Sequence, residues 1–390
     1  MTETPTCSAH HPDVLIIGGG VLGCSVAYHL ALRGCSRVTL VERDTLASGT
    51  TAKGAGGVRQ QFSDETNIAL SRYSVQFFEQ LQEHLALPKQ SFQQVGYLFL
   101  LRTTEELASY QAGVDLQRRM GVPAQLLSPQ EIQAVCPGLY VDDLLGATFC
   151  ASDGYSSPPQ VARAFARKAR QLGVQILEGV EVLALQKSGD RIDAVETSAG
   201  TFHPGNVVCC AGAWSGEIGK MSGVNIPIQP LPRMCFRSAP LPTLPSHLPM
   251  VIDVHNSFYF RPDGDARFLL SMNSPEAYSF AMTVDWAWSE TVLVEARRRV
   301  PAFSQLVIEE GWSGLYEDSP DHNAILGPVP EIPNLLIAAG FSGHGFMQSP
   351  AAGLALSECI LDGSSHTLDI SAFSIERFAS GQLRAERNII

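Results

Sequence analysis

The chain has 390 residues and a formal net charge of −12 at pH 7, because 39 Asp and Glu residues outnumber 27 Lys and Arg residues. This balance argues against nucleic acid as a partner, since phosphate binding needs a basic surface. No apolar run reaches the length of a membrane span, and residues 1–13 show no secretory signal. We therefore expect a cytoplasmic protein with no transmembrane segment and with room for two domains.

The nine cysteines and ten histidines show no metal-binding pattern. The sequence contains no Cys-x-x-Cys pair and no His-x-x-x-His spacing. The cysteines stand within apolar segments, where reduced thiols act as small hydrophobic side chains. We expect neither a structural nor a catalytic metal.

The segment VLIIGGGVLGCSVAYHLALRG, residues 14–34, predicts a dinucleotide-binding βαβ unit. It places Gly18, Gly20 and Gly23 in GxGxxG spacing between a predicted strand and a predicted helix, and VTLVE follows as a second strand. The glycines allow a tight turn, and the helix N-terminus presents free amides to a pyrophosphate. Glu42 is placed to bind ribose hydroxyls, so the expected ligand is FAD or NAD(H) rather than NADP.

Residues 48–66 are too rich in Gly, Ser and Thr for regular structure and are expected to form a functional loop. Beyond them, apolar residues recur at helical spacing, and Ser or Thr followed three residues later by Glu marks helix starts. The expected elements are helices at 67–85, 103–121, 128–138 and 161–172 and a strand at 96–101.

A second backbone approach to the dinucleotide is expected where the strand containing Val207 and Val208 runs into AGAWS. The small residues Ala211 and Gly212 would allow a close turn there. Farther along, prolines cluster between residues 227 and 249, which excludes long helices and suggests a crossing between domains.

The later part of the chain predicts two strands, a helix and a final strand, turn and helix unit. The strands are expected at 258–261 and 268–272, and the helix ends at Pro301. The final unit has a strand at 334–339, a glycine-rich turn at 340–345 and a helix at 348–361, closed by Gly363 and with Pro350 in its first turn.

These motifs resemble the D-amino-acid-oxidase-type family of FAD-dependent oxidoreductases. The resemblance rests on the fingerprint with Glu42, the loop KGAGGVRQQFS, the CCAGAWS turn and the block GLYEDSPDHNAILG followed by GFSGHGFMQSPAAG. It covers nearly the whole chain and is strongest to the sarcosine oxidase β-subunit, proline dehydrogenase and dimethylglycine dehydrogenase branch. It implies FAD as cofactor and oxidation of the C–N bond of a small secondary amine or amino acid by hydride transfer, followed by hydrolysis of the imine.

The resemblance also implies an α/β fold, α+β overall, in which a Rossmann-type FAD-binding domain is interrupted by a sheet-containing substrate domain. The expected ranges are 12–90, 146–222 and 311–365 for the FAD-binding domain, 91–145 and 223–310 for the substrate domain, and 366–390 for a C-terminal extension.

The candidate catalytic residues are those that the resemblance places around the flavin. Arg59 and Tyr316 are expected at the substrate carboxylate, Tyr259 beside them, and His344 and Met347 in the turn at the pyrimidine edge of the ring. The candidate FAD-binding residues follow the glycine-rich turns and the loop between them: Gly18, Gly20, Val21, Leu22, Gly23, Glu42, Arg43, Ser48, Thr50, Thr51, Lys53, Gly56, Gly57, Val58, Val180, Ala211, Gly212, Trp214, Gly340, Gly343, His344, Gly345, Phe346 and Met347.

Two departures from relatives affect the expected chemistry. Monomeric sarcosine oxidases attach FAD to a cysteine at the position of Gly314, so FAD is expected to be held without a covalent bond here. Those oxidases also carry two lysines where this chain has Met347 and either Leu269 or Leu270. The electron acceptor is therefore left open between oxygen and another oxidant.

Two other functions remain as alternatives. An NAD-dependent dehydrogenase is disfavoured, because that fold rarely needs a closing glycine-rich turn near the C-terminus. A flavin-binding subunit that acts only with partner subunits, or without turnover, would share the same motifs.

Overall fold

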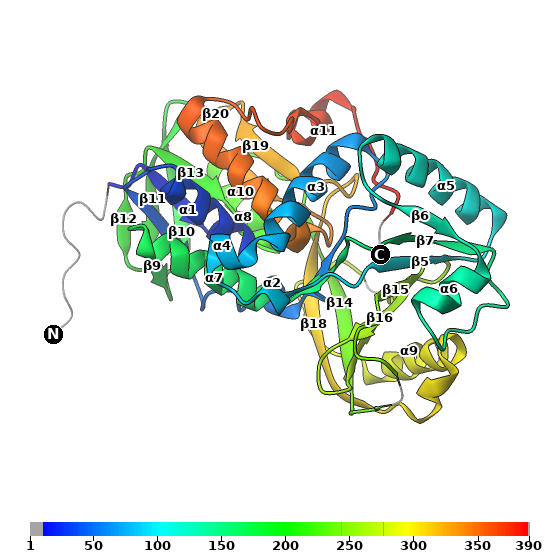
Figure 1. Ribbon diagram of the computed structural model, residues 1–390. Helices are drawn as coiled ribbons and strands as arrows, with labels where there is room; N and C mark the ends of the chain where they lie inside the picture. The colour runs from blue at the N-terminus through cyan, green and yellow to red at the C-terminus, as the bar shows by residue number, and fades with distance from the viewer. Residues whose placement is uncertain (1–10, 243, 276, 389–390) are drawn as a thin grey trace.

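Two large sheets organise the chain in the computed structural model, which describes residues 11–242, 244–275 and 277–388. Figure 1 shows a Rossmann-like half on one side and a second sheet with its own helices on the other, joined by the long strands β14 and β18. This arrangement agrees with the expected α/β class and Rossmann-type domain.

The six-stranded sheet has the order β19-β20-β13-β1-β2-β9. All its neighbouring pairs are parallel except β19 with β20. Its strands are β1 (Val14–Ile17), β2 (Val38–Glu42), β9 (Gln175–Glu178), β13 (Asn206–Cys209), β19 (Ile325–Val329) and β20 (Ile332–Ala339).

Helices cover one face of this sheet, and a small antiparallel sheet covers the other. The covering helices are α1 (Val21–Leu32), α3 (Glu65–Glu79), α4 (Leu81–Leu85), α7 (Pro158–Gln171) and α10 (Gly345–Asp362). The small sheet consists of β10 (Val182–Ser188), β11 (Arg191–Thr197) and β12 (Gly200–Phe202), and α8 (Ser215–Ser222) lies beside it. A sheet buried on both faces explains the continuous apolar runs of its central strands.

The eight-stranded sheet has the order β18-β14-β17-β16-β15-β5-β7-β6. Its strands are β5 (Tyr97–Leu101), β6 (Gln125–Leu127), β7 (Gly146–Cys150), β14 (Gln229–Ser238), β15 (Met250–Asp253), β16 (Phe258–Pro262), β17 (Phe268–Ser271) and β18 (Ile308–Asp318). The helices of this half are α5 (Thr104–Arg119), α6 (Pro129–Val135) and α9 (Trp286–Arg299). β7 and most of β18 fall in ranges that we expected in the FAD-binding domain, but both belong to this sheet.

Helix starts match the sequence signals because capping is a local property. Thr103 with Glu106 and Ser128 with Glu131 both form complete capping boxes. The expected helix 67–85 is instead divided at Gln80 into α3 and α4.

The loop expected at 48–66 contains two short regular elements. They are α2 (Thr50–Lys53) and β3 (Gly57–Val58), and β3 pairs with β8 (Gly154–Ser156), which also pairs with β4 (Phe92–Gln93). The expectation of a wholly irregular loop was therefore wrong, since pairing with a distant strand supplies order that the local composition does not reveal.

The proline-rich segment contains the ten-residue strand β14, which the sequence analysis missed. Pro230 and Pro232 pair only with β18, whereas β17 pairs with β14 over residues 235–237. Proline lacks an N–H group, so it is tolerated where a strand has a partner on one side alone.

Helix α10 begins earlier than expected, at Gly345, so that Pro350 lies in its second turn rather than its first. Proline cannot donate a hydrogen bond to the carbonyl of Phe346. The Ser349 hydroxyl donates to that carbonyl instead, at 2.9 Å.

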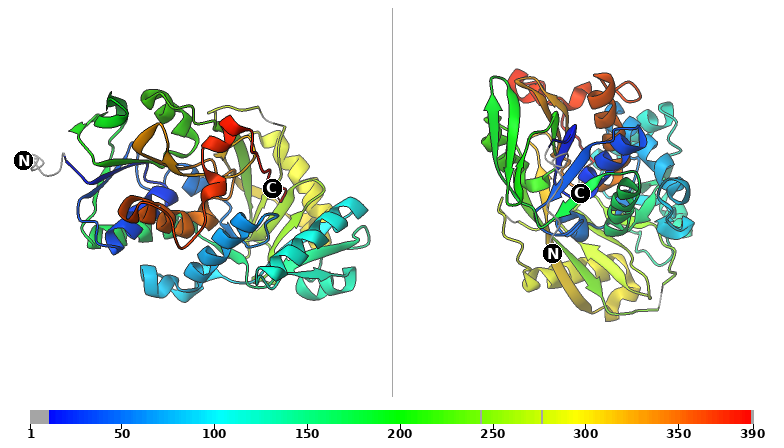
Figure 2. Two further views of the ribbon diagram at one scale, coloured as in Figure 1. Left: turned by 90° about the horizontal axis from the view of Figure 1, so that it is seen from above. Right: turned by 90° about the vertical axis from the view of Figure 1, so that its left-hand side faces the viewer.

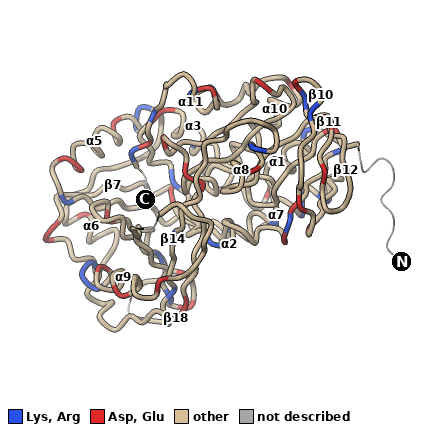
Figure 3. The backbone as a smooth tube through the Cα atoms, turned by 180° about the vertical axis from the view of Figure 1, so that it is seen from behind, with Lys and Arg blue, Asp and Glu red and all other residues tan. Residues whose placement is uncertain are grey.

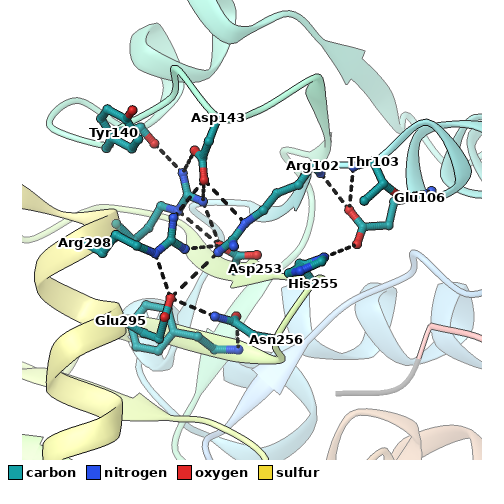
Figure 4. A network of polar contacts seen from close by, with 12 residues as sticks. Arg102, Thr103, Glu106, Tyr140, Asp143, Asp253, His255, Asn256, Glu295 and Arg298 are labelled. Carbon is teal, nitrogen blue, oxygen red and sulfur yellow. Dashed lines mark hydrogen bonds and ion pairs between the residues drawn. The ribbon is translucent and has the colours of Figure 1, made fainter.

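A buried ionic cluster fixes α9 to the end of β15 (Figure 4). Asp253 is almost fully buried and accepts hydrogen bonds from Arg102, Arg298 and Arg299. Asp143 accepts from Arg298 and Arg299, each at 2.8 Å. Each carboxylate therefore faces several guanidinium groups, as buried charges require.

The C-terminal segment after α11 (Glu376–Ser380) returns to the middle of the molecule, as all three ribbon views show (Figures 1 and 2). The Glu386 carboxylate accepts hydrogen bonds from the Ser63 amide at 3.1 Å and from the Asn67 side chain at 3.4 Å. Charged positions of both signs are dispersed along both halves of the described chain (Figure 3).

Candidate functional site

A cavity of about 420 Å³ lies between the two halves and receives side chains from both large sheets. Most of the residues selected from the sequence line it: Gly18, Gly20, Val21, Leu22, Glu42, Arg43, Thr50, Thr51, Lys53, Gly56, Gly57, Arg59, Val180, Ala211, Gly212, Trp214, Tyr259, Tyr316, Gly343, His344, Gly345, Phe346 and Met347. The structure therefore brings together segments that are up to 329 residues apart, Gly18 and Met347 being examples.

Four selected residues lie outside the cavity lining. Gly23 packs so closely on Gly18 that a Cβ atom would overlap the Gly18 carbonyl oxygen, which explains its role in holding α1 against the turn. Val58 is fully buried in the core, and the Ser48 hydroxyl donates to the carbonyl of Thr45. Gly340 precedes the cavity-lining turn and has a φ of 73°.

The first glycine-rich turn has the geometry of an anion-binding site. Gly18 has a φ of 108°, and a Cβ atom there would overlap the carbonyl oxygen of Cys210 in the neighbouring turn. Helix α1 begins after Gly20 without a side-chain N-cap of its own. The Thr51 hydroxyl accepts a hydrogen bond from the Val21 amide at 3.1 Å, and the helix start otherwise faces the cavity.

Glu42 and Trp214 mark one end of the cavity. The Glu42 carboxylate accepts hydrogen bonds from the Gly19 amide at 2.6 Å and the Asp44 amide at 2.9 Å, which orients it at the end of β2. The Arg43 guanidinium lies 4.0 Å from the centre of the Trp214 ring, and Phe280 stacks on the same ring at 5.5 Å. This end offers a carboxylate and a stacked aromatic surface.

Arg59 is fully buried, and its guanidinium is already bound by the protein. It donates to the backbone carbonyls of Gln61 and Asn388, each at 2.5 Å, and to Nε2 of His344 at 3.1 Å. Only its Nε has no partner in the described part of the chain. These contacts use both terminal nitrogens of the guanidinium, and the role of Arg59 at a substrate carboxylate stays a prediction.

The contact with Arg59 also defines the state of His344. A guanidinium only donates hydrogen bonds, so Nε2 of His344 must accept and the ring proton must be on Nδ1. Burial and the Arg59 charge hold the pKa of His344 well below its usual range. His344 is therefore a neutral imidazole at pH 7, packed edge to face against Phe62.

Arg233 is the cavity residue that the sequence analysis missed on the substrate side. Its guanidinium carbon lies 5.6 Å from the centre of the Tyr316 ring. Its Nη1 donates to the carbonyl of Pro232 at 3.2 Å, its buried Nε has no partner, and no ion pair among the described residues includes it. Arg233 lies in a proline-rich strand and belongs to no recognisable motif, so the sequence alone does not indicate that it lines the cavity.

The phenols of Tyr259 and Tyr316 stay protonated at neutral pH, because burial raises the pKa of each. The Tyr259 hydroxyl lies 3.5 Å from the sulfur of Cys235. Tyr316 packs on the C-terminal turn, where a Cβ atom on Gly343 would lie 2.7 Å from its ring. Both residues line the same part of the cavity as Arg233.

Gly314 lies against Lys53, and a Cβ atom at Gly314 would come within 2.6 Å of the Lys53 Cβ. The side chain of Lys53 thus occupies the space that a cysteine at residue 314 would need. Met347 lines the cavity, whereas Leu269 and Leu270 are buried in the packing of the eight-stranded sheet.

In the described part of the chain, no helix has the length and apolar character needed to cross a membrane. No group of three or more His, Cys, Asp or Glu side chains there is arranged to hold a metal ion.

Comparison with known proteins shows what this architecture is similar to. Residues 13–359 match the DAO family, described as FAD dependent oxidoreductase. The chain is 33% identical over 436 residues to FAD-dependent oxidoreductase domain-containing protein 1 of Bos taurus, covering 100% of this chain and 89% of that protein. It is 29% identical over 377 residues to sarcosine oxidase subunit beta of an Arthrobacter species, covering 95% and 92%. The structure of L-proline dehydrogenase from P. horikoshii matches with a TM-score of 0.92 at 31% identity, covering 96% of this chain and 100% of that one.

Proposed function

Because this chain belongs to the DAO family of FAD-dependent oxidoreductases, which act on amino acids or amines, we propose a narrower activity for it. The proposed reaction is oxidation of the C–N bond of a small secondary amino acid of the sarcosine or proline type. Bound FAD would supply the hydride acceptor, and water would hydrolyse the imine product.

The residues of the cavity fit FAD, and we propose that they hold it without a covalent bond. The start of α1 and the turn at Gly18 and Gly20 would receive the pyrophosphate, because the dipole at the N-terminus of the helix favours an anion there. Glu42 would accept hydrogen bonds from ribose hydroxyls. Glycine is required at Gly18 and Gly23, where a Cβ atom would overlap the neighbouring backbone, and this close packing holds the turn in the form that binds a dinucleotide.

The observation that carries the choice of an amino acid is the unpaired cation at Arg233. Arg59 donates three hydrogen bonds to protein groups, whereas Arg233 donates one and lines the cavity beside Tyr316. A carboxylate would complete such a site, since a guanidinium binds it through two parallel hydrogen bonds. The Tyr316 hydroxyl would donate to the same carboxylate.

The walls of the cavity would hold the substrate amine away from bulk water. Tyr259, Cys235 and Met250 contribute buried, uncharged surface. An amine in such surroundings favours its neutral, reactive form, because burial disfavours the charged ammonium.

An anaerobic reduction screen tests the proposal. Purified protein with bound FAD is mixed with N-methyl and cyclic amino acids and with the corresponding amines that lack a carboxylate. Bleaching of the flavin absorbance by one of the amino acids is the expected result. Reduction by the simple amines alone would contradict the substrate class.

A second candidate is a flavin-binding subunit that turns over only with a partner. Four large apolar side chains exposed within one short segment favour it: Tyr278, Phe280, Met282 and Trp286. We further propose a cytoplasmic location, supported by eight described cysteines that are all unpaired. Repeated turnover of substrate by the isolated chain, with oxygen or an artificial dye as electron acceptor, would exclude the partner-dependent function.

A further inference from the structure

Glu317 is a buried acid in the cavity that would hold FAD, and the negative charge of FAD would disfavour its ionised form. It lies on β18, lines the cavity and is only 8% exposed. FAD carries a negatively charged pyrophosphate, and burial of a second unpaired anion beside it would be costly. The surroundings of Glu317 therefore decide in which protonation state it coexists with FAD.

The carboxyl group of Glu317 bridges two glycine-rich turns. Its Oε2 lies 3.8 Å from the position that a Cβ atom on Gly212 would occupy, and its Oε1 lies 3.3 Å from the corresponding position on Gly345. The backbone amides of Gly340 and Phe341 act to lower the pKa of the group, but burial outweighs them. Both turns line the cavity, so the carboxyl group touches two of the backbone segments that would enclose the cofactor.

No cation compensates this carboxyl group. Oε2 has no hydrogen-bond partner, and none of the ion pairs among the described residues includes Glu317. Glu317 interacts electrostatically with the thiols of Cys209, at the end of β13, and Cys210, just after it, and burial raises the pKa of both, which keeps them neutral. The opposing residue on β14 is Pro230, which has no donor to offer.

We propose that Glu317 is a neutral carboxylic acid when FAD is bound, and that FAD binding is coupled to uptake of a proton at this residue. The group acts as a positioning residue that joins the turn at Gly212 to the start of α10 without placing a second negative charge beside the cofactor.

The protonation of Glu317 in the protein without FAD agrees with this coupling. Burial raises the pKa of Glu317 to about 7, so near neutral pH the free protein contains both forms. FAD would select the protonated form, since the ionised form repels it. The affinity for FAD should therefore be constant in mild acid and should fall as the pH rises above neutrality.

The decisive experiment measures release of FAD from the holoprotein as a function of pH. Free flavin fluorescence after ultrafiltration at pH 6, 7, 8 and 9 gives the fraction released. We expect the Kd of the wild-type protein to rise at least about tenfold between pH 7 and pH 9. Glu317→Gln keeps the shape and neutrality of the acid, so its Kd should stay nearly constant over that range.

A matched control separates Glu317 from other carboxylates at the site. Glu181 also lines the cavity but is exposed to solvent. Glu181→Gln should therefore show the same pH dependence as the wild type. Identical pH profiles for the wild type and Glu317→Gln, or a flat profile for the wild type, would overturn the proposal.

Infrared spectroscopy provides a second readout that does not depend on folding of a variant. The wild-type holoprotein at pH 8 should show the C=O stretching band of a protonated carboxyl group that disappears when FAD is removed. Absence of that change overturns the proposal even if Glu317→Gln fails to fold. Neither readout involves an amine substrate, so the inference is tested independently of the proposed reaction.

Discussion

Arg233 offers the most direct test of how the site recognises its substrate. In Arg233→Met the cavity loses a guanidinium that has no carboxylate partner in the described protein, so no protein anion is left unpaired. The substitution should therefore weaken binding of the substrate carboxylate rather than the stability of the protein. A charge-assisted hydrogen bond contributes about 1.5 to 3 kcal/mol, which corresponds to a decrease of roughly 10- to 100-fold in kcat/KM.

The assay compares each amino acid with the amine that lacks its carboxylate, such as proline with pyrrolidine. We expect Arg233→Met to lower kcat/KM for the amino acid alone, and Tyr316→Phe to act in the same direction with a smaller effect. Arg237→Met is the matched control, since Arg237 lies on the same strand but pairs with Glu310. Equal losses for amino acid and amine would refute the assignment of Arg233.

Four further predictions concern the cofactor, the fold and the electron acceptor. Acid denaturation should release FAD without a flavin adduct on the chain, because Lys53 fills the space beside Gly314; mass spectrometry of the denatured protein checks this. Glu42→Ala should weaken FAD retention during dialysis by the loss of charge-assisted hydrogen bonds of about 1.5 to 3 kcal/mol each, and unchanged retention would exclude the ribose contact. Asp253→Asn should destabilise the protein by about 3 to 5 kcal/mol in denaturant unfolding, because its guanidinium partners lose their buried counter-charge; a change below about 1 kcal/mol would contradict this reasoning. Reoxidation of the reduced enzyme in air should be slower than reoxidation by an artificial dye, because Met347 and the buried Leu269 and Leu270 stand where oxygen-using relatives are expected to carry lysines; stopped-flow rates in air that match substrate reduction would show otherwise.

The parts of the fold that depend on neighbouring residues were predictable. The first βαβ unit and both capping boxes follow from spacings of a few residues, and the structure contains them. The division of α3 from α4 at Gln80 and the ordering of β3 were not predictable, because both depend on packing against distant segments.

The residues of the site also fall into those that the sequence indicates and those that only the folded structure reveals. The turns at Gly18 and Gly343 could be found because glycine leaves a visible sequence signal. Arg59 could be selected from its loop, but its contact with Asn388 could not be foreseen, because that contact spans 329 residues. Arg233 and Glu317 stand in strands without a motif, so only the folded arrangement reveals that they line the cavity.

The return of the C-terminal segment has a consequence for the order in which the site is completed during synthesis. Asn388 supplies the carbonyl that holds Arg59, and Glu386 binds the amide of Ser63, so the loop that contains Arg59 and Ser63 gains these partners only after residues 386–388 have been made. A ribosome-bound chain would thus carry a formed dinucleotide turn beside an Arg59 that is still free to move. Changes that disturb residues 386–388 would remove the partners of Arg59 and of the Ser63 amide at a place far away in the sequence.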